Sequence, residues 1–250
     1  MSGHSKWATI KRSKGKADAA RGKVFNRLIR EITIAARMGG GDKDGNPRLR
    51  SAIASARAAN MPNKNVDTAI LKGTGQLEGV TYEEITWEGY GPSGVAILVD
   101  TMTDNRNRTV AEVRHMLTRH GGNMGATNSV NWMFKLKGLI IVPKDARDEE
   151  SLMEVVLESG AEDMTVEDDA YEITTSPETF EAVRQALEKI GVVPTTAEIT
   201  KIPENVVQLD VDSIVKVLKL VDGLDDLDDT QNVYHNCEIT DEAIEKYSKG

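Results

Sequence analysis

Cysteine is nearly absent from this chain of 250 residues, in which Cys237 is the only one. A single cysteine excludes an internal disulfide framework and suits a reducing compartment. No run of 18 apolar residues is present, so the sequence predicts no transmembrane helix. The N-terminus also has no apolar core of the kind that a signal peptide needs. These absences predict a soluble cytoplasmic protein with no membrane partner.

Side chains that ligate metals or perform catalysis are also scarce. The four histidines are His4, His115, His120 and His235, and no pair has the spacing of a zinc site. His235 and Cys237 alternate in a predicted strand and so share a face. A cysteine nucleophile also needs a third group to orient its base, and none is evident. The sequence therefore predicts no metal ion, no cofactor and no enzymatic activity.

Two segments have compositions that phosphate-binding or cation-binding loops also have. The loop GGGDKDGNP at residues 39–47 does not satisfy a Walker A motif. An EF-hand counted from Asp42 would need a Glu at the position of Ile53. The run DDLDD at residues 225–229 has the charge to attract Mg²⁺ loosely, but such runs are usually solvated. We expect an interhelical loop at the first segment and a solvated helix end at the second.

Charge is strongly segregated along the chain. The formal net charge is −9, yet residues 1–75 contain 16 Lys and Arg against 5 Asp and Glu, a net of +11. Residues 76–250 contain 15 basic and 35 acidic side chains, a net of −20. Because a basic surface attracts polyanions and an acidic one repels them, the two parts are expected to have different partners. The alternative is that the acidic surface serves solubility alone.

Helical periodicity begins near Ala17 and predicts a helix that ends at Met38, before three glycines. Its apolar residues lie on one face and its cations on the opposite face. Further helices are predicted over residues 47–59 and 62–73. Residues 17–73 therefore read as a three-helix unit, preceded by a flexible basic arm.

Beyond residue 76 the pattern changes to alternating strands and helices. Residues 82–91 and 94–103 are predicted strands, 107–122 a helix, and 128–143 two strands broken near Gly138. Residues 137–202 follow the order β-α-β-β-α-β of a ferredoxin-like unit, with a net charge of −10.

The helix and strand predicted over residues 211–240 cannot close a core alone, so they are expected to join the sheet of residues 80–135. The predicted fold class is α+β, with an N-terminal three-helix domain and two ferredoxin-like α/β domains, one inserted in the other. The expected boundaries are a basic arm at 1–16, a basic helical domain at 17–76, a split α/β domain at 77–136 and 204–240, and an acidic inserted domain at 137–203.

The cations of the arm and first helix are the main candidates for nucleic-acid binding, because Lys and Arg neutralise phosphates and release counterions. Trp7 is a candidate for stacking on a base, or else it packs on the helical domain. The candidate residues here are Lys6, Trp7, Lys11, Arg12, Lys14, Lys16, Lys23, Arg27, Arg30 and Arg37. The alternative for the helix is a solvated cationic face.

The segment TDNRNRT at residues 103–109 precedes the predicted helix at 107–122. Asp104 or Asn105 is suited to cap that helix. Arg106 and Arg108 add two cations at a helix start, where main-chain amides already favour anions. The two arginines are therefore either a second phosphate contact or partners of the acidic surface.

Several motifs resemble one family closely. They are MSGHSKWATIK at 1–11, NPRLR at 46–50, TDNRNRT at 103–109, GGNMG at 121–125, SVNWMF at 129–134, GAEDM at 160–164 and VYHNCEI at 233–239. From residue 1 to about 240 the chain is similar to the YebC/PmpR family of probable transcriptional regulatory proteins. The resemblance implies three domains, with one α/β domain inserted in the other. Arg12 departs from the His that many members have there.

The resemblance also implies two kinds of function. Family members are described as probable transcriptional regulators, whereas others are associated with the ribosome, and a mitochondrial relative is described as a translational activator of cytochrome c oxidase subunit I. We expect a non-enzymatic, DNA-binding regulator of transcription that contacts promoter DNA. The alternative is a translation factor that binds ribosomal RNA through the basic arm and helix. A protein-interaction scaffold or an enzyme is less favoured.

Physical features of the sequence bear on that choice. No helix-turn-helix with an evident set of base-reading side chains is present. The Gly-Lys-Trp arm suits crevices of folded RNA at least as well as a groove of duplex DNA. The sequence identifies no protein partner for the acidic domains.

Overall fold

The computed structural model describes residues 17–167 and 169–249, and these form two compact units. The N-terminal unit contains residues 17–127 and 216–233, and the C-terminal unit contains residues 128–215 and 234–249. Among these described residues, no helix has both the length and the apolar character needed to cross a membrane.

The helical part of the N-terminal unit consists of α2 (Ala17–Gly39), α3 (Pro47–Ala58) and α4 (Asn63–Gly73). Their shared core contains Ile32, Ala35, Ala36, Leu49, Ala52, Ile53, Ala56, Met61, Val66 and Ala69. The three predicted helices are therefore confirmed. Asn46 joins two of them, because its side chain accepts a hydrogen bond from the Leu49 N–H (3.0 Å) and donates one to the Ala35 carbonyl (2.8 Å). Val24, predicted on the apolar face, is instead 42% exposed.

The sheet of the N-terminal unit has the order β3-β1-β2-β8. Its strands are β1 (Glu83–Tyr90), β2 (Ala96–Thr103), β3 (Asn123–Met124) and β8 (Thr230–His235). β1 pairs antiparallel with β2 and β3, and a short 3-10 turn, η1 (Pro92–Gly94), joins β1 to β2. Because β8 flanks β2, the predicted return of the strand within residues 230–240 to this sheet is confirmed.

Two helices accompany this sheet, α5 (Arg106–Arg119) and α8 (Val211–Asp225). α5 buries Val113 and Leu117. α5 and α8 meet closely, since a Cβ atom at Gly223 would lie 2.7 Å from the Met116 sulfur. α5 and α8 therefore pack closely within the N-terminal unit, and residues 226–229 join α8 to β8.

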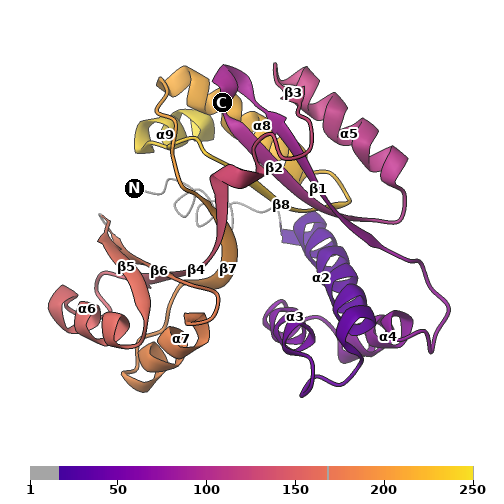
Figure 1. The fold of residues 1–250 in the computed structure, drawn as a ribbon, viewed down its shortest axis with the longest axis horizontal. Coiled ribbons are helices and arrows are strands. Elements are labelled where there is room, and N and C mark those ends of the chain that lie inside the picture. The colour runs from indigo at the N-terminus through magenta and orange to yellow at the C-terminus, as the bar shows by residue number, and fades with distance from the viewer. Residues whose placement is uncertain (1–16, 168, 250) are drawn as a thin grey trace. The chain divides into compact units, whose positions relative to one another are not determined.

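The C-terminal unit contains the second sheet, with the order β5-β6-β4-β7. Its strands are β4 (Phe134–Pro143), β5 (Ala161–Val166), β6 (Ala170–Thr175) and β7 (Thr196–Pro203). All its pairs are antiparallel. α6 (Glu149–Glu158) and α7 (Phe180–Lys189) lie on one face of the sheet (Figure 1) and share a core with β4 and β6. This is the predicted ferredoxin-like arrangement.

Gly138 does not break the chain into two strands, so that prediction is wrong. A 3-10 turn, η2 (Asn131–Met133), precedes β4, and β4 then continues through Gly138, which pairs with both Thr175 and Ile199. A Cβ atom at residue 138 would lie 2.6 Å from Phe180 Cδ2 and closer still to Thr175 Oγ1. The glycine is therefore required by close packing.

The predicted class is confirmed: the protein is α+β, with an N-terminal helical part and two α/β sheets. In the chain, β4–β7 are inserted between β3 and β8. A helix that the sequence analysis did not predict, α9 (Asp241–Lys249), follows β8 and buries Ala243 and Ile244. The finer domain boundaries stay a prediction.

Candidate nucleic-acid interface

The candidate residues of the basic arm fall outside the described part of the chain. These are Lys6, Trp7, Lys11, Arg12, Lys14 and Lys16. Their role in binding stays a prediction.

The cationic stripe of α2 lies against the acidic run at residues 225–229, which we call the acidic turn. Lys23 Nζ lies 2.9 Å from Asp226 Oδ1, and Arg27 Nη2 lies 3.0 Å from Asp225 Oδ1. Arg27 also donates to the main-chain carbonyl of Asp225 at 2.6 Å. These two predicted phosphate contacts are therefore occupied by groups of the chain itself.

Arg30, one turn further along α2, meets the buried end of the acidic turn. Its Nη2 lies 3.1 Å from Asp229 Oδ1, and its Nη1 donates to the main-chain carbonyl of Asp228. Its guanidinium carbon also lies 5.6 Å from the centre of the Tyr82 ring, a cation–π contact. Arg30 is thus the most fully engaged cation of the stripe.

Asp229 corrects the expectation of a solvated acidic end, because its side chain is only 1% exposed. Its Oδ2 accepts hydrogen bonds from Thr109 Oγ1 (2.7 Å), Thr103 Oγ1 (3.0 Å) and Arg108 Nη2 (2.7 Å). Burial raises the pKa of Asp229, but the hydrogen bonds from Arg108, Thr109 and Thr103 outweigh burial and hold it below the ordinary value. Asp226, by contrast, is 82% exposed.

Arg106 and Arg108 have internal partners as well. Asn105 caps α5 by accepting from the Arg108 N–H at 3.1 Å. The Arg108 guanidinium pairs with Asp104 (2.8 Å) and Asp229 (2.7 Å), and these pairings raise its pKa. The Arg106 guanidinium carbon lies 5.7 Å from the centre of the Trp87 ring. For Arg108, these contacts match the alternative of salt bridges with acidic groups.

Arg48, in the motif NPRLR, is also paired. It lies 2.7 Å from Glu31 on α2 and 2.5 Å from Glu84 on β1, and the hydrogen bonds that it donates to these carboxylates raise its pKa. It therefore joins α3 to two other elements. Of the residues predicted to bind nucleic acid, Lys23, Arg27, Arg30 and Arg108 are paired with acidic groups of the chain itself.

Several exposed cations of the described residues have no acidic partner, and three of them lie on α3 and the loop before it. Lys43, Arg50 and Arg57 are exposed, and within the described residues they form no ion pair; we call these three residues the α3 patch. Arg50 Nη1 lies 3.3 Å from the main-chain carbonyls of Lys43 and Asp44, which holds the loop beside the helix. Arg50 and Arg57 are seven residues apart, so they lie on one face of α3.

The exposed surface of α3 beside these arginines is made of small side chains. Ser51, Ala54, Ser55 and Ala58 are all exposed on α3. The sequence analysis missed this patch because it followed the density of cations at the N-terminus. The available signal was the seven-residue spacing of Arg50 and Arg57 beside the apolar stripe that begins at Leu49.

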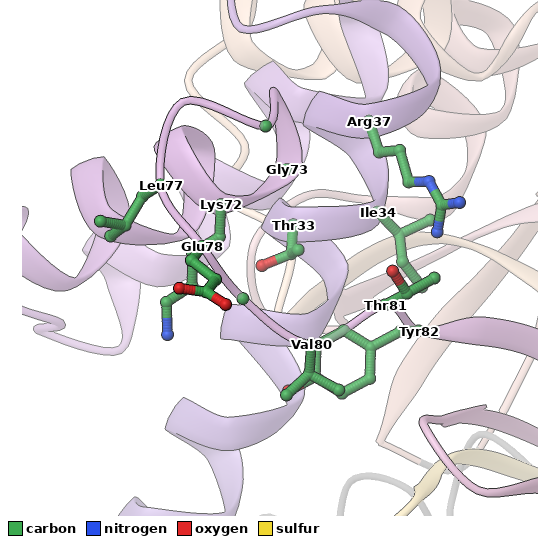
Figure 2. A pocket seen from close by; sticks show the side chains of 12 residues that line it. Thr33, Ile34, Arg37, Lys72, Gly73, Leu77, Glu78, Val80, Thr81 and Tyr82 are labelled. Carbon is green, nitrogen blue, oxygen red and sulfur yellow. The ribbon is translucent and has the colours of Figure 1, made fainter.

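Arg37, the remaining α2 candidate, lines an open cavity of about 330 Å³ within the N-terminal unit. Figure 2 shows that the side chains around the cavity come from α2, the end of α4 and the segment that leads into β1. Lys72 lines it too, and both cations are exposed. Glu78 also lines the cavity and reduces its net positive charge.

The cysteine–histidine pair is not arranged for nucleophilic catalysis. His235 Nδ1 accepts a hydrogen bond from the Cys237 main-chain N–H at 3.3 Å, whereas Cys237 Sγ donates to the Glu238 carbonyl at 3.4 Å. Burial raises the pKa of Cys237 to about 12. Among residues 17–167 and 169–249, no group of three or more His, Cys, Asp or Glu side chains is placed to hold a metal ion.

Comparison with known proteins places these features in one family. The profile described as TACO1/YebC protein N-terminal domain matches residues 5–76, and the one described as TACO1/YebC second and third domain matches residues 82–237. A probable transcriptional regulatory protein of Geobacter sulfurreducens is 57% identical, over 98% of this chain and 99% of its own length. One of the same description from Desulforapulum autotrophicum is 56% identical, over 98% and 99%.

A solved structure agrees with this grouping. The crystal structure of a conserved hypothetical protein from Aquifex aeolicus has a TM-score of 0.80 and 49% sequence identity, and the match covers 90% of this chain and 93% of that one. The matched domains cover both α/β sheets and the helical part. The chain therefore belongs to the TACO1/YebC family.

Proposed function

We propose that this protein is a cytoplasmic, non-enzymatic regulator of gene expression that binds nucleic acid, with promoter DNA as the first candidate target. The observation that carries the proposal is the α3 patch, where Lys43, Arg50 and Arg57 are exposed and have no acidic partner among residues 17–167 and 169–249. The names of the relatives, probable transcriptional regulatory proteins, support the choice of DNA.

The α3 patch has the chemistry that a phosphate backbone requires. Arginine donates to phosphate through two parallel N–H groups, and two such arginines lie on one helix face. The exposed residues Ala54 and Ser51 lie beside them on the helix, and such small side chains leave room for a polyanion to approach. The basic arm, with five further cations, would extend this contact along the nucleic acid.

Ribosomal RNA is the second candidate, favoured by where the free cations lie. Lys43 is in a loop, Arg50 and Arg57 are on α3, and Lys64 is on α4. A protein that reads duplex DNA usually places one helix in the major groove with polar base-reading side chains. The face of α3 beside its arginines offers alanine and serine instead, which suits backbone contacts with folded RNA.

Binding itself is tested with the double substitution Arg50→Gln and Arg57→Gln. We expect weaker binding to both duplex DNA and folded RNA, and a salt dependence of log Kd reduced in slope by about two, one for each lost phosphate contact. The matched control is Lys216→Gln with Lys219→Gln, which removes two exposed cations from α8. Equal losses in both variants would contradict a role for α3.

The target is identified by crosslinking in cells, followed by sequencing of both bound RNA and bound DNA. The full chain is compared with the double α3 variant and with a variant that lacks residues 1–16. Crosslinks at promoters that survive RNase and depend on α3 or the arm support the transcriptional regulator. Crosslinks concentrated in ribosomal RNA favour the translation factor, and no signal above background overturns the proposal.

A further inference from the structure

The acidic turn occupies the cationic stripe of α2 as a row of phosphates would. Lys23, Arg27 and Arg30 follow one another at spacings of four and three residues, so they line one face of the helix. Their carboxylate partners, Asp226, Asp225 and Asp229, come from one five-residue segment about 200 positions away in the chain. Three negative charges within five residues resemble the charge density of a nucleic-acid strand.

We propose that the acidic turn is an internal competitor that limits nucleic-acid binding by the α2 face and is displaced when nucleic acid binds there. This inference rests on the proposed function and states how the same basic surface is regulated. The α3 patch, which has no acidic partner in the described part of the chain, then gives the first contact, and the α2 face adds to it only after the turn is displaced.

The contacts become steadily more accessible toward the N-terminal end of α2. For Arg30 and Asp229 the side chains are 15% and 1% exposed, and for Arg27 and Asp225 they are 22% and 17% exposed. For Lys23 and Asp226 they are 24% and 82% exposed. Asp229 keeps Arg108, Thr103 and Thr109 as partners whether or not Arg30 stays. Asp229 is therefore held independently of α2, and the contact of the turn with α2 that solvent and ligands reach most easily is the one at Asp226.

Arg27 has a hydrogen-bond donor that the acidic turn leaves without an acceptor. It donates to Asp225 through Nη2, but its Nε atom is buried and has no hydrogen-bond partner among the described residues. A buried donor without a partner is costly. A phosphate group accepts two parallel N–H bonds from one guanidinium, so it would use this donor as well.

The test is the double substitution Asp225→Asn and Asp226→Asn in the full chain, with binding to a 20-nucleotide RNA and to a 20-base-pair duplex DNA measured at fixed salt. We expect affinity for at least one of these probes to rise about three- to tenfold. This is the effect expected when the substitutions remove two partly exposed ion pairs that compete with the probe. In a chain that also carries Lys23→Gln and Arg27→Gln, the same two changes should have no effect. Thermal unfolding followed by circular dichroism checks that each variant is folded.

Two controls keep the result specific. Glu149→Gln with Glu150→Gln removes two exposed carboxylates from α6 and reports the effect of net charge alone. Asp226→Asn alone changes an 82% exposed side chain and stays informative if the Asp225 change unfolds the chain. If the affinity rises no more than in the α6 control while the wild type still binds nucleic acid, the competitor role of the acidic turn is wrong. The proposed function is then unaffected. Absence of binding by every variant and by the wild type overturns both.

Discussion

Asp229 is a buried structural residue within a charged run that was expected to be solvated. In the sequence it is the last of four aspartates in the run DDLDD, and nothing there distinguishes it from Asp226. In the structure it accepts hydrogen bonds from residues of β2 and α5 and pairs with Arg30 of α2. A carboxylate buried with several donors stabilises a fold only while its partners stay in place.

We predict that Asp229→Ala lowers the free energy of unfolding by about 3 kcal/mol, because it leaves Arg30, Arg108 and two threonine hydroxyls without their shared acceptor. Urea denaturation at neutral pH measures this. The matched variant Asp226→Ala, at an 82% exposed position, should cost about 0.5 kcal/mol or less. Equal costs for the two variants would show that Asp229 has no special structural role.

The lowered pKa of Asp229 also predicts a pH dependence. A carboxyl group whose pKa is lower in the folded than in the unfolded chain contributes stability above its ordinary pKa of 3.8. That contribution is lost as pH falls through the lower folded-state value. The stability difference between the wild type and Asp229→Asn should therefore be constant from pH 7 to about pH 5 and shrink below 3.8. A difference that grows in acid would show that the pKa is raised.

Cys237 gives a second prediction at the residue scale. Burial raises its pKa from 9.0 to about 12, so near neutral pH its thiolate fraction falls about a thousandfold. Because the thiolate is the reacting species, the native protein should react with a thiol reagent at least about a thousandfold more slowly than the chain unfolded in urea. A fast native reaction would reopen the possibility of a cysteine nucleophile.

At the scale of elements, β4 shows why a glycine can be wrongly predicted to interrupt a strand. Gly138 resembles a strand break by composition, but its role is to let β4 lie close to Thr175 and Phe180. A pattern in one segment does not show which neighbour approaches it, because that neighbour comes from another segment. α2 shows the opposite case, since its apolar and cationic faces are both predictable from its own periodicity.

Gly138→Ala should destabilise the protein by about 1–3 kcal/mol, because the added Cβ atom overlaps the Thr175 hydroxyl and the Phe180 ring. The matched control is Gly22→Ala on α2, where a Cβ atom would meet no atom within 4 Å. There the substitution should stabilise the protein by about 0.5–1 kcal/mol, because alanine favours the helix. Chemical denaturation of both variants tests the pair, and equal effects would contradict this account of Gly138.

At the scale of the whole molecule, charge that is segregated in the sequence is partly balanced in the fold. Residues 17–127 and 216–233, which form the N-terminal unit, contain 17 Lys and Arg and 17 Asp and Glu. Five of these acidic residues come from residues 216–233 alone. The net positive charge of the first 75 residues therefore overstates how much of that charge is free to bind a polyanion.

The proposed function predicts that the protein purified from cells carries nucleic acid. Treatment with nuclease should release this material and lower the ratio of absorbance at 260 nm to that at 280 nm. A protein-interaction scaffold would instead retain an acidic protein partner through the same treatment, and the two functions are separated in this way. Raising the salt concentration alone would weaken both kinds of complex.

The sequence by itself determined the α+β class, the three N-terminal helices, the ferredoxin-like order of residues 137–202 and the family. Each of these depends on local periodicity or on motifs that lie within one segment. α9 and the continuity of β4 were missed, the second because Gly138 is explained only by contacts with β6 and α7.

The tertiary structure alone decided which cations have internal partners. Lys23, Arg27 and Arg30 meet carboxylates about 200 residues away, whereas Arg50 and Arg57, close to them in sequence, meet none among the described residues. Sequence patterns place a charge on a helix face, but they do not show what lies opposite that face. An ion pair depends on the distance between two groups in space, and only the folded chain sets that distance.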